Sequence, residues 1–278
     1  MRTIIGIDYD GDYKAALHAY SKLAFREPHI ELVHVEPSLM VGGLGGSAYT
    51  YANYSTIQEA LKKDGEQLLA AAQSELNFSG YAAETLYVEG RVCETILERA
   101  DETHADLVVV GSSHKSPYGA FFLGSIGREL TLRAHHSLLI AKHDTVPTGK
   151  FTAVFATDGS DYADECLRML VRMRPQGIGR LAVVTAVDHL VDGRPPKAIK
   201  DHVDRLVGHL RDECIEANGH VVEGSVPKVI DTMMESTGAE LLIMGAQGHG
   251  FVERLVVGSV SLQEVVARPH SVLLLRTR

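Results

Sequence analysis

The chain has 278 residues, of which 45% are hydrophobic and 23% charged, and its formal net charge at pH 7 is −9. This composition is typical of a globular protein, and the length suits one large domain or two ordinary ones. The negative charge argues against nucleic acid or an anionic membrane as the main partner. No apolar run approaches the roughly 18 residues that span a bilayer. We therefore expect neither a nucleic-acid-binding nor a membrane protein.

The cysteines and the N-terminal segment indicate the compartment. Cys93, Cys166 and Cys214 form neither a disulfide framework nor a C-x-x-C pair, so a reducing cytoplasm is the simplest interpretation. Charges at Arg2 and Asp8 interrupt the apolar segment that a signal peptide would need. The sequence therefore predicts a cytoplasmic protein.

Residues 1–144 alternate strand-like and helix-like stretches. Short β-branched and apolar runs predict five strands, at residues 2–8, 30–35, 84–88, 106–110 and 137–141. The first helix carries Ala16, Ala19, Tyr20 and Leu23 on one face, and further helices are expected over 55–76, over 92–103 and from Ser125 to about 135. The glycine- and tyrosine-rich segment 41–54 is expected to be a loop, either a lid over a ligand, a partner contact or a segment packed on its own tyrosines (Tyr49, Tyr51 and Tyr54).

The same order of elements recurs in residues 150–278. Strands are predicted over 151–157, 181–187, 220–222, 239–244 and 271–276, with helices after Asp158, from 195 to about 218, over 227–236 and after Gly258. Pro147 and Gly149 break the intervening linker. We therefore predict two domains, 1–144 and 150–278, called here the first and second repeat.

Strands that alternate with helices predict parallel sheets covered on both faces. Each repeat is accordingly expected to be a flavodoxin-like α/β domain with a five-stranded parallel sheet, and ligands of such sheets bind beyond the carboxyl ends of the strands. The repeats differ in length, because Asp8 and Asp158 are 150 positions apart whereas Gly111 and Gly245 are 134 apart. We expect most of the extra 16 residues in and beside the glycine-rich loop 42–46.

A glycine motif joins a strand end to a helix start in the second repeat. It consists of Gly245-Ala246-Gln247-Gly248, nine further residues, and Gly258-Ser259-Val260-Ser261. Glycine lets backbone N–H groups approach a ligand, and a helix N-terminus offers unpaired N–H groups and partial positive charge. Ser259 is placed to act as an N-cap and as a donor to an anion. The motif predicts a phosphate cradle that is neither a P-loop nor a Rossmann loop, although glycines at strand ends also serve plain turns.

The first repeat carries an altered version of this motif. It reads Gly111-Ser112-Ser113-His114, nine residues, and Gly124-Ser125-Ile126-Gly127. His114 replaces the second glycine, so its side chain either blocks the approach of a ligand or donates to a phosphate itself. We expect altered or weaker binding in this repeat, with an intact site as the alternative.

The spacing Gly-x2-Gly-x9-Gly-Ser after an apolar strand resembles the nucleotide-binding motif of the universal stress protein family, and the resemblance covers nearly the whole chain twice. It implies two tandem domains of the adenine nucleotide alpha hydrolase-like fold that bind ATP, ADP or AMP, with Mg²⁺, in a regulatory role in stress response. The site residues implied for the second repeat are Asp158, Ala186, Gly245, Gly248, His249, Gly258, Ser259, Val260 and Ser261. Those implied for the first repeat are Asp8, Val35, Gly111, His114, Gly124 and Ser125.

Two of these positions need comment. A carboxylate such as Asp158, at the end of a strand, can accept hydrogen bonds from ribose hydroxyls or help hold a metal ion, while an N-cap for the next helix is the plain alternative, which Ser160 or Asp161 could also fill. The family reads the adenine edge with backbone groups, at positions that correspond to Ala186 and Val35. The family resemblance also implies that the first and fourth strands of each repeat are neighbours.

Partner expectations follow from the family resemblance too. In the family the last strands of two domains commonly pair across a dimer, so residues 137–141 and 271–276 are expected to pair within this chain as a pseudo-dimer; a homodimer of the whole chain is also open. The 14 histidines show no spacing of a metal site, and we predict no metal ligands and no catalytic residues. The alternatives are a slow ATP hydrolase, an enzyme that phosphorylates itself on Ser259 or Ser261, and a scaffold that acts through segment 41–54 without nucleotide.

Overall fold

The structure is a computed structural model of the whole chain. It describes residues 1–38, 48–112, 124–142, 149–187, 195–247 and 257–277. Gly248, His249, His114 and residues 41–47 of the predicted loop therefore lie outside the described residues, as do the side chains of Tyr49, Tyr51 and Tyr54.

The first repeat contains five strands and four helices among its described residues, in alternation. The strands are β1 (Arg2–Gly6), β2 (His29–Pro37), β3 (Ala83–Gly90), β4 (Leu107–Gly111) and β5 (Ser137–Ala141). The helices are α1 (Tyr13–Leu23), α2 (Ala48–Phe78), α3 (Val92–Glu102) and α4 (Ser125–Arg133). This order confirms the predicted alternation.

The second repeat has the same order. Its strands are β6 (Phe151–Ala156), β7 (Ile178–Val187), β8 (Ala217–Glu223), β9 (Leu241–Gly245) and β10 (Ser271–Leu275). Its helices are α5 (Asp161–Met173), α6 (Pro196–Asp212), α7 (Val226–Thr237) and α8 (Ser259–Ala267).

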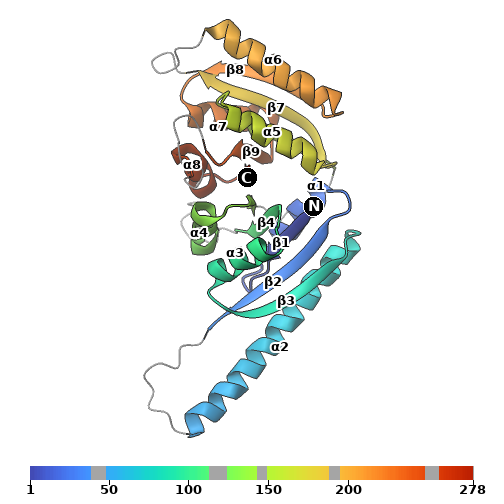
Figure 1. Cartoon of the computed structure of the whole chain (residues 1–278), viewed down its shortest axis with the longest axis vertical. Coiled ribbons are helices and arrows are strands. Elements are labelled where there is room, and N and C mark those ends of the chain that lie inside the picture. The colour runs from blue at the N-terminus through green and yellow to red at the C-terminus, as the bar shows by residue number, and fades with distance from the viewer. Residues whose placement is uncertain (39–47, 113–123, 143–148, 188–194, 248–256, 278) are drawn as a thin grey trace.

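All ten strands form one continuous sheet in the order β3-β2-β1-β4-β5-β10-β9-β6-β7-β8 (Figure 1). Within each repeat the strands are parallel, and β1 pairs with β4 as β6 pairs with β9. The predicted adjacency of first and fourth strands is therefore confirmed. The two five-stranded sheets that we expected are halves of a single larger sheet.

The two halves meet at one antiparallel pair of strands. Val272, Leu273 and Leu274 of β10 lie opposite Ile140, Leu139 and Leu138 of β5. All six side chains are fully buried, and the pairing satisfies the backbone groups that the edge of each half-sheet would otherwise expose. This confirms that the last strands of the two repeats pair within the chain.

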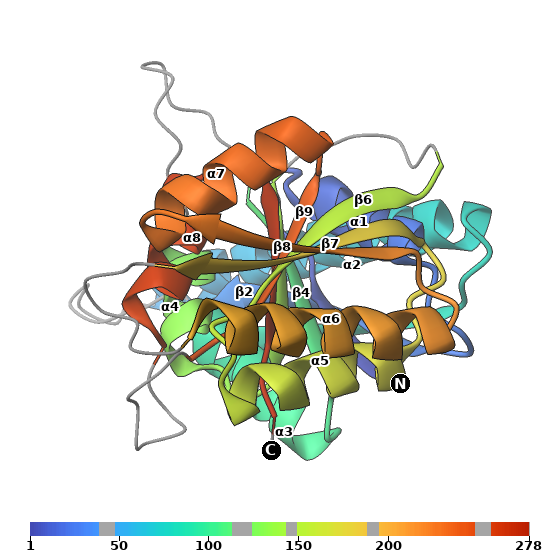
Figure 2. The ribbon, with the colours of Figure 1, turned by 90° about the horizontal axis from the view of Figure 1, so that it is seen from above.

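Among the described residues, four helices cover each face of the sheet. Buried residues of α1, α2, α5 and α6 form one core with the strands, and those of α3, α4, α7 and α8 form the other. Figure 2 shows α7 on one side of β7 and β8, with α5 and α6 on the other. The predicted inward face of α1 is confirmed, since Ala16, Ala19, Tyr20 and Leu23 are all buried.

Two predictions were wrong: that residues 41–54 form a loop, and that the long helix of the second repeat extends to about residue 218. α2 already includes residues 48–54 and has 31 residues, whereas α6 has 17 and ends at Asp212. The 14-residue difference places most of the extra length of the first repeat in a helix rather than in the glycine-rich loop. In Figure 1 the N-terminal turns of α2 project well beyond the sheet. In the part of the chain that the structure describes, no helix combines the length and apolar composition required to cross a bilayer.

Replacing Leu273 by alanine tests the importance of the antiparallel pair. Leu273 is 0% exposed at the centre of that pair, opposite Leu139, so a cavity there should lower the free energy of unfolding by about 2–5 kcal/mol. Leu132→Ala on α4 is the control, because Leu132 is 44% exposed and its loss should change stability by less than about 0.5 kcal/mol. Urea unfolding followed by circular dichroism measures both; equal effects would contradict a central role for the pair.

Candidate functional site

The carboxyl ends of three neighbouring strands, β6, β7 and β9, carry three of the predicted second-repeat residues. β6 and β9 are paired in the sheet, with Ala156 opposite Met244. Asp158 follows the end of β6 by two residues, and Gly245 is the last residue of β9. Ala186 lies near the end of β7, and β6 lies between β7 and β9 in the sheet. The sequence prediction that these positions share one end of the sheet agrees with this arrangement.

The start of α8 is held against the end of β9. The N–H of Gly258 donates to the carbonyl oxygen of Ala246 at 2.8 Å, and the N–H of Ala246 donates to the carbonyl oxygen of Leu275 at 3.0 Å. Gly258 is the N-cap of α8, so the expectation that Ser259 would be the N-cap was wrong. Because a glycine N-cap has no side-chain oxygen, it leaves the first N–H groups of α8 without a cap from that residue. Ser259 is exposed in the first turn.

Ser261 has a structural partner. Its side chain is buried, at 3% exposure, and its hydroxyl donates to the carbonyl oxygen of Gly245 at 3.0 Å. This bond crosses from the first turn of α8 to the end of β9. Ser261 thus fixes the position of the helix N-terminus, and the exposed Ser259 is the hydroxyl that faces solvent.

Asp158 shapes the loop between β6 and α5. Its Oδ1 accepts from the backbone N–H of Ser160 at 3.0 Å and from the Ser160 hydroxyl at 2.6 Å. Ser160 is the N-cap of α5, and its Oγ accepts from the N–H of Ala163 at 3.2 Å. The N-cap role that was the plain alternative for Asp158 therefore belongs to Ser160, and the carboxylate supports that cap while it remains partly exposed at the strand end.

Packing accounts for the first glycine of the motif in both repeats. A Cβ on Gly245 would lie 2.9 Å from Cε1 of Tyr162 and 3.4 Å from Sγ of Cys166, both on α5. A Cβ on Gly111 would overlap the backbone of Asp12 at the start of α1. The close approach that requires glycine here is that of the neighbouring helix, which motif spacing alone does not reveal.

The first repeat reproduces this geometry with differences. Gly124 is the N-cap of α4 and Ser125 is the exposed first residue of that helix. Gly127, which stands where the second repeat has Ser261, is buried and has no hydroxyl to tie α4 to β4. Burial raises the pKa of the Asp8 carboxyl, although the N–H of Asp12, which donates to Asp8 Oδ1 at 3.0 Å, lowers it in part. Val35, on β2, is buried.

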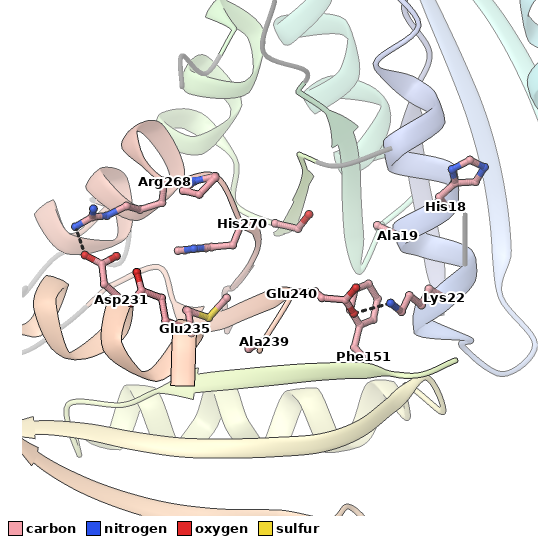
Figure 3. Close-up of a pocket in the computed structure, with 13 residues that line it drawn as sticks. His18, Ala19, Lys22, Phe151, Asp231, Glu235, Ala239, Glu240, Arg268 and His270 are labelled. Atoms are coloured by element: carbon pink, nitrogen blue, oxygen red, sulfur yellow. Dashed lines mark hydrogen bonds and ion pairs between the residues drawn. The ribbon is translucent and has the colours of Figure 1, made fainter. Parts of the chain in front are cut away.

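A pocket that the sequence did not predict lies where the two repeats meet (Figure 3). Its volume is about 480 Å³. It opens at the amino ends of β6, β9 and β10, away from Asp158 and Gly245, so it does not coincide with the predicted site. Four of its charged residues form two ion pairs: Lys22 Nζ lies 2.6 Å from Glu240 Oε2, and Arg268 Nη2 lies 2.8 Å from Asp231 Oδ2. These partners are far apart in sequence, and no motif indicates them.

Comparison with known proteins decides the family. The model described as "Universal stress protein family" matches residues 1–142 and again residues 152–276. The chain belongs to the universal stress protein family. Among curated proteins, the universal stress protein YxiE of Bacillus subtilis is 28% identical over 145 residues, which are 51% of this chain and 98% of YxiE. One YxiE-sized protein thus corresponds to about half of this tandem universal stress protein.

Solved structures show the same tandem fold. A universal stress protein from Archaeoglobus fulgidus matches with a TM-score of 0.71 at 19% identity, covering 99% of this chain and 98% of its own. Two other family structures carry ligands, namely an Arabidopsis thaliana member with AMP bound and a universal stress protein in complex with cAMP. Each is 17% identical with a TM-score of 0.37; they cover 51% and 47% of this chain, and 92% and 100% of their own.

Alanine at position 245 tests the packing explanation for the first glycine. The new Cβ would press on Tyr162, so Gly245→Ala should destabilise this universal stress protein by about 1–3 kcal/mol. A Cβ on Gly208, inside α6, would meet no atom within 4 Å, and Gly208→Ala should instead stabilise by about 0.5–1 kcal/mol. Denaturant midpoints of both variants give the comparison; a stable Gly245→Ala protein would refute the packing role.

Thiol labelling tests the burial of α5 against the end of β10. Burial raises the pKa of Cys166 to about 12 and that of Cys93 to about 11, whereas Cys214 is exposed. Since the thiolate is the reactive form, an aromatic disulfide reagent at neutral pH should label about one thiol rapidly in the folded chain and all three after denaturation. Retention of the fast phase in a Cys214→Ser variant would contradict this assignment.

Proposed function

We propose that this protein binds an adenine nucleotide, ATP, ADP or AMP, mainly in its second repeat, and that binding serves a regulatory role in stress response. The proposed units are residues 1–144 and 150–278. Family membership supports the ligand class, because members of the family have been solved with AMP and with cAMP.

One observation carries the proposal. Asp158, Gly245 and the glycine-capped N-terminus of α8 lie at the carboxyl ends of two adjacent parallel strands. Ligands of α/β sheets bind at this end of the strands. A helix N-terminus whose N-cap has no side-chain oxygen leaves its first N–H groups to a phosphate group. The proposed contacts are a carboxylate for ribose hydroxyls, backbone groups at Ala186 for the adenine edge, and the first turn of α8 with Ser259 for phosphate.

The two helices that follow the glycine motifs have the same kind of N-cap. Ser160 caps α5 with its own hydroxyl, whereas the N-caps of α8 and α4 are both glycines. Both helices with a glycine N-cap follow the motif, so no N-cap side chain competes with a phosphate for their first N–H groups. Mg²⁺ would accompany the longer phosphate chains, and Asp158 is a carboxylate at this end of the sheet that would help to hold it.

The first repeat is proposed to bind more weakly. It lacks the Ser261-type bond between helix and strand because Gly127 occupies that position. His114 stands in place of the second glycine.

Calorimetric titration with ATP and Mg²⁺ tests the proposal on the full chain. The wild-type protein should bind about one nucleotide per chain. Gly248→Val should lower the affinity by about tenfold to 100-fold, because a side chain there would displace charge-assisted hydrogen bonds to phosphate. His114→Gly, which restores the second glycine of the first repeat, should raise the number bound toward about two.

Gly208→Val on α6 is the matched control, since that glycine has open space around it, and it should bind nucleotide as the wild type does. Normal binding by Gly248→Val would refute the cradle assignment. A wild-type protein that binds no adenine nucleotide, yet retains a stable protein partner in pull-down experiments, would favour the scaffold alternative.

The alternative of an enzyme that phosphorylates itself has two candidate hydroxyls, those of Ser259 and Ser261. Ser261 is buried and donates to Gly245, whereas Ser259 is exposed. Phosphate transfer from ATP to the chain would therefore be detected on Ser259, and Ser259→Ala with radiolabelled ATP distinguishes transfer from binding alone.

A further inference from the structure

Two buried cations follow the two strands that join the repeats. Lys142 comes directly after β5 and is 5% exposed; Arg276 comes directly after β10 and is also 5% exposed. A shift of 134 residues relates them (276 − 142), which is the same shift that relates the glycine motifs. Their backbone N–H groups make matching bonds, to Ser271 Oγ at 3.0 Å and to Ser137 Oγ at 3.2 Å.

Each cation reaches into the other repeat. Lys142 Nζ donates to the carbonyl oxygens of Val265 and Arg268, the latter at 2.5 Å. Both carbonyls belong to the C-terminal end of α8, where unpaired carbonyls and the negative end of the helix dipole favour a cation.

Arg276 makes the reciprocal contact. Its Nη2 donates to the carbonyl oxygen of Thr131 at 2.6 Å, and Thr131 lies in the last turn of α4. Thr131 and Val265 are again 134 residues apart (265 − 131). The same shift of 134 residues relates the two donors and the two acceptors, so the two contacts are equivalent in the two repeats.

These helices are the ones whose N-termini form the proposed phosphate sites. The strands that carry the cations also bond to the motifs, because Ser112 N–H donates to Ala141 at 2.8 Å and Ala246 N–H donates to Leu275 at 3.0 Å. Ala141, which accepts from the first motif, directly precedes Lys142, whose side chain bonds to α8. Leu275 likewise accepts from the second motif and directly precedes Arg276, whose side chain bonds to α4. In both directions, the motif of one repeat is thus connected to the helix of the other through one backbone hydrogen bond, one peptide link and the side chain of the cation.

Stability alone does not explain a lysine at this position. Burial lowers the pKa of Lys142 to about 8, while Glu264 opposes that shift. Glu264 is itself fully buried, with Oε2 at 3.4 Å from His270 Nε2 and Oε1 at 3.7 Å from Arg268 Nε; Arg268 and His270 line the pocket in Figure 3. Since a well-packed apolar side chain often stabilises a buried site as well as a charge does, the cation points to a positioning role.

We propose that Lys142 and Arg276 are reciprocal positioning residues, each of which holds the C-terminal end of the phosphate-binding helix of the other repeat and so couples the two nucleotide sites. The effect on nucleotide binding rests on the proposed function, whereas the contacts of Lys142 with α8 and of Arg276 with α4 do not.

Hydrogen exchange on the full chain without nucleotide tests the hold itself. Lys142→Met keeps an unbranched side chain but removes the donor, and should speed exchange of the amides of α8 by about threefold to tenfold while those of α4 keep their rate. Arg276→Met should do the reverse. The single variant Lys142→Arg keeps a donor and should keep the slow exchange of α8. Lys228→Met, which alters an exposed lysine of α7, should leave the exchange rates of both α4 and α8 unchanged. Faster exchange confined to the repeat that carries the substitution, or spread evenly over both, would overturn the proposal.

Nucleotide titration tests the coupling. Lys142→Met should weaken ATP binding in the second repeat by about threefold to tenfold but leave adenosine binding unchanged, because only the phosphates contact α8. Equal loss for ATP and adenosine would indicate general damage and overturn the positioning role, as would unchanged ATP affinity despite faster exchange in α8. A wild-type chain that binds neither ligand would refute the proposed function and the coupling, and the exchange data would still decide whether Lys142 holds α8.

Discussion

The antiparallel pairing of β5 with β10 is the constraint on which the rest of the structure depends. A five-stranded parallel half-sheet that ended at β5 would expose a row of apolar side chains and unpaired backbone groups. Pairing buries both edges in one ten-stranded sheet. It also fixes direction: since β5 and β10 run antiparallel, their carboxyl ends, which are followed by Lys142 and Arg276, lie at opposite ends of the pair. The reciprocal contacts of Lys142 and Arg276 exist only because of that reversal.

Much of the fold could be predicted from sequence because buried parallel strands are continuous apolar runs. The positions of the strands followed from those runs, and the pairing of the last strands followed from the repeat and the family resemblance. The end of α6 did not, because β8 is an edge strand whose residues are largely exposed, so it carries little hydrophobic signal. The start of α2 was missed because glycine and tyrosine composition next to it favours a loop, whereas the backbone of residues 48–54 is helical.

The candidate site was predictable as a set of positions but not as a set of contacts. Motif spacing identified Gly245 and Ser261, yet the packing around Gly245 depends on residues far away in sequence: Tyr162 packs on Gly245, and its hydroxyl donates to Leu275 at 3.2 Å. Local sequence cannot specify partners this distant along the chain. The contacts of Lys142 could not be predicted for the same reason, because their partners lie more than 120 residues away in the other repeat.

The unequal helices α2 and α6 give the molecule a distinguishable end. A symmetric dimer of single repeats would carry two identical projecting helices and could bridge two partners, one on each side. Here the long helix occurs once, on the repeat that also has the altered motif. Any protein that recognises the projecting turns of α2 would therefore bind one copy per chain and in one orientation, so the unequal helices remove the twofold equivalence that two identical repeats would have.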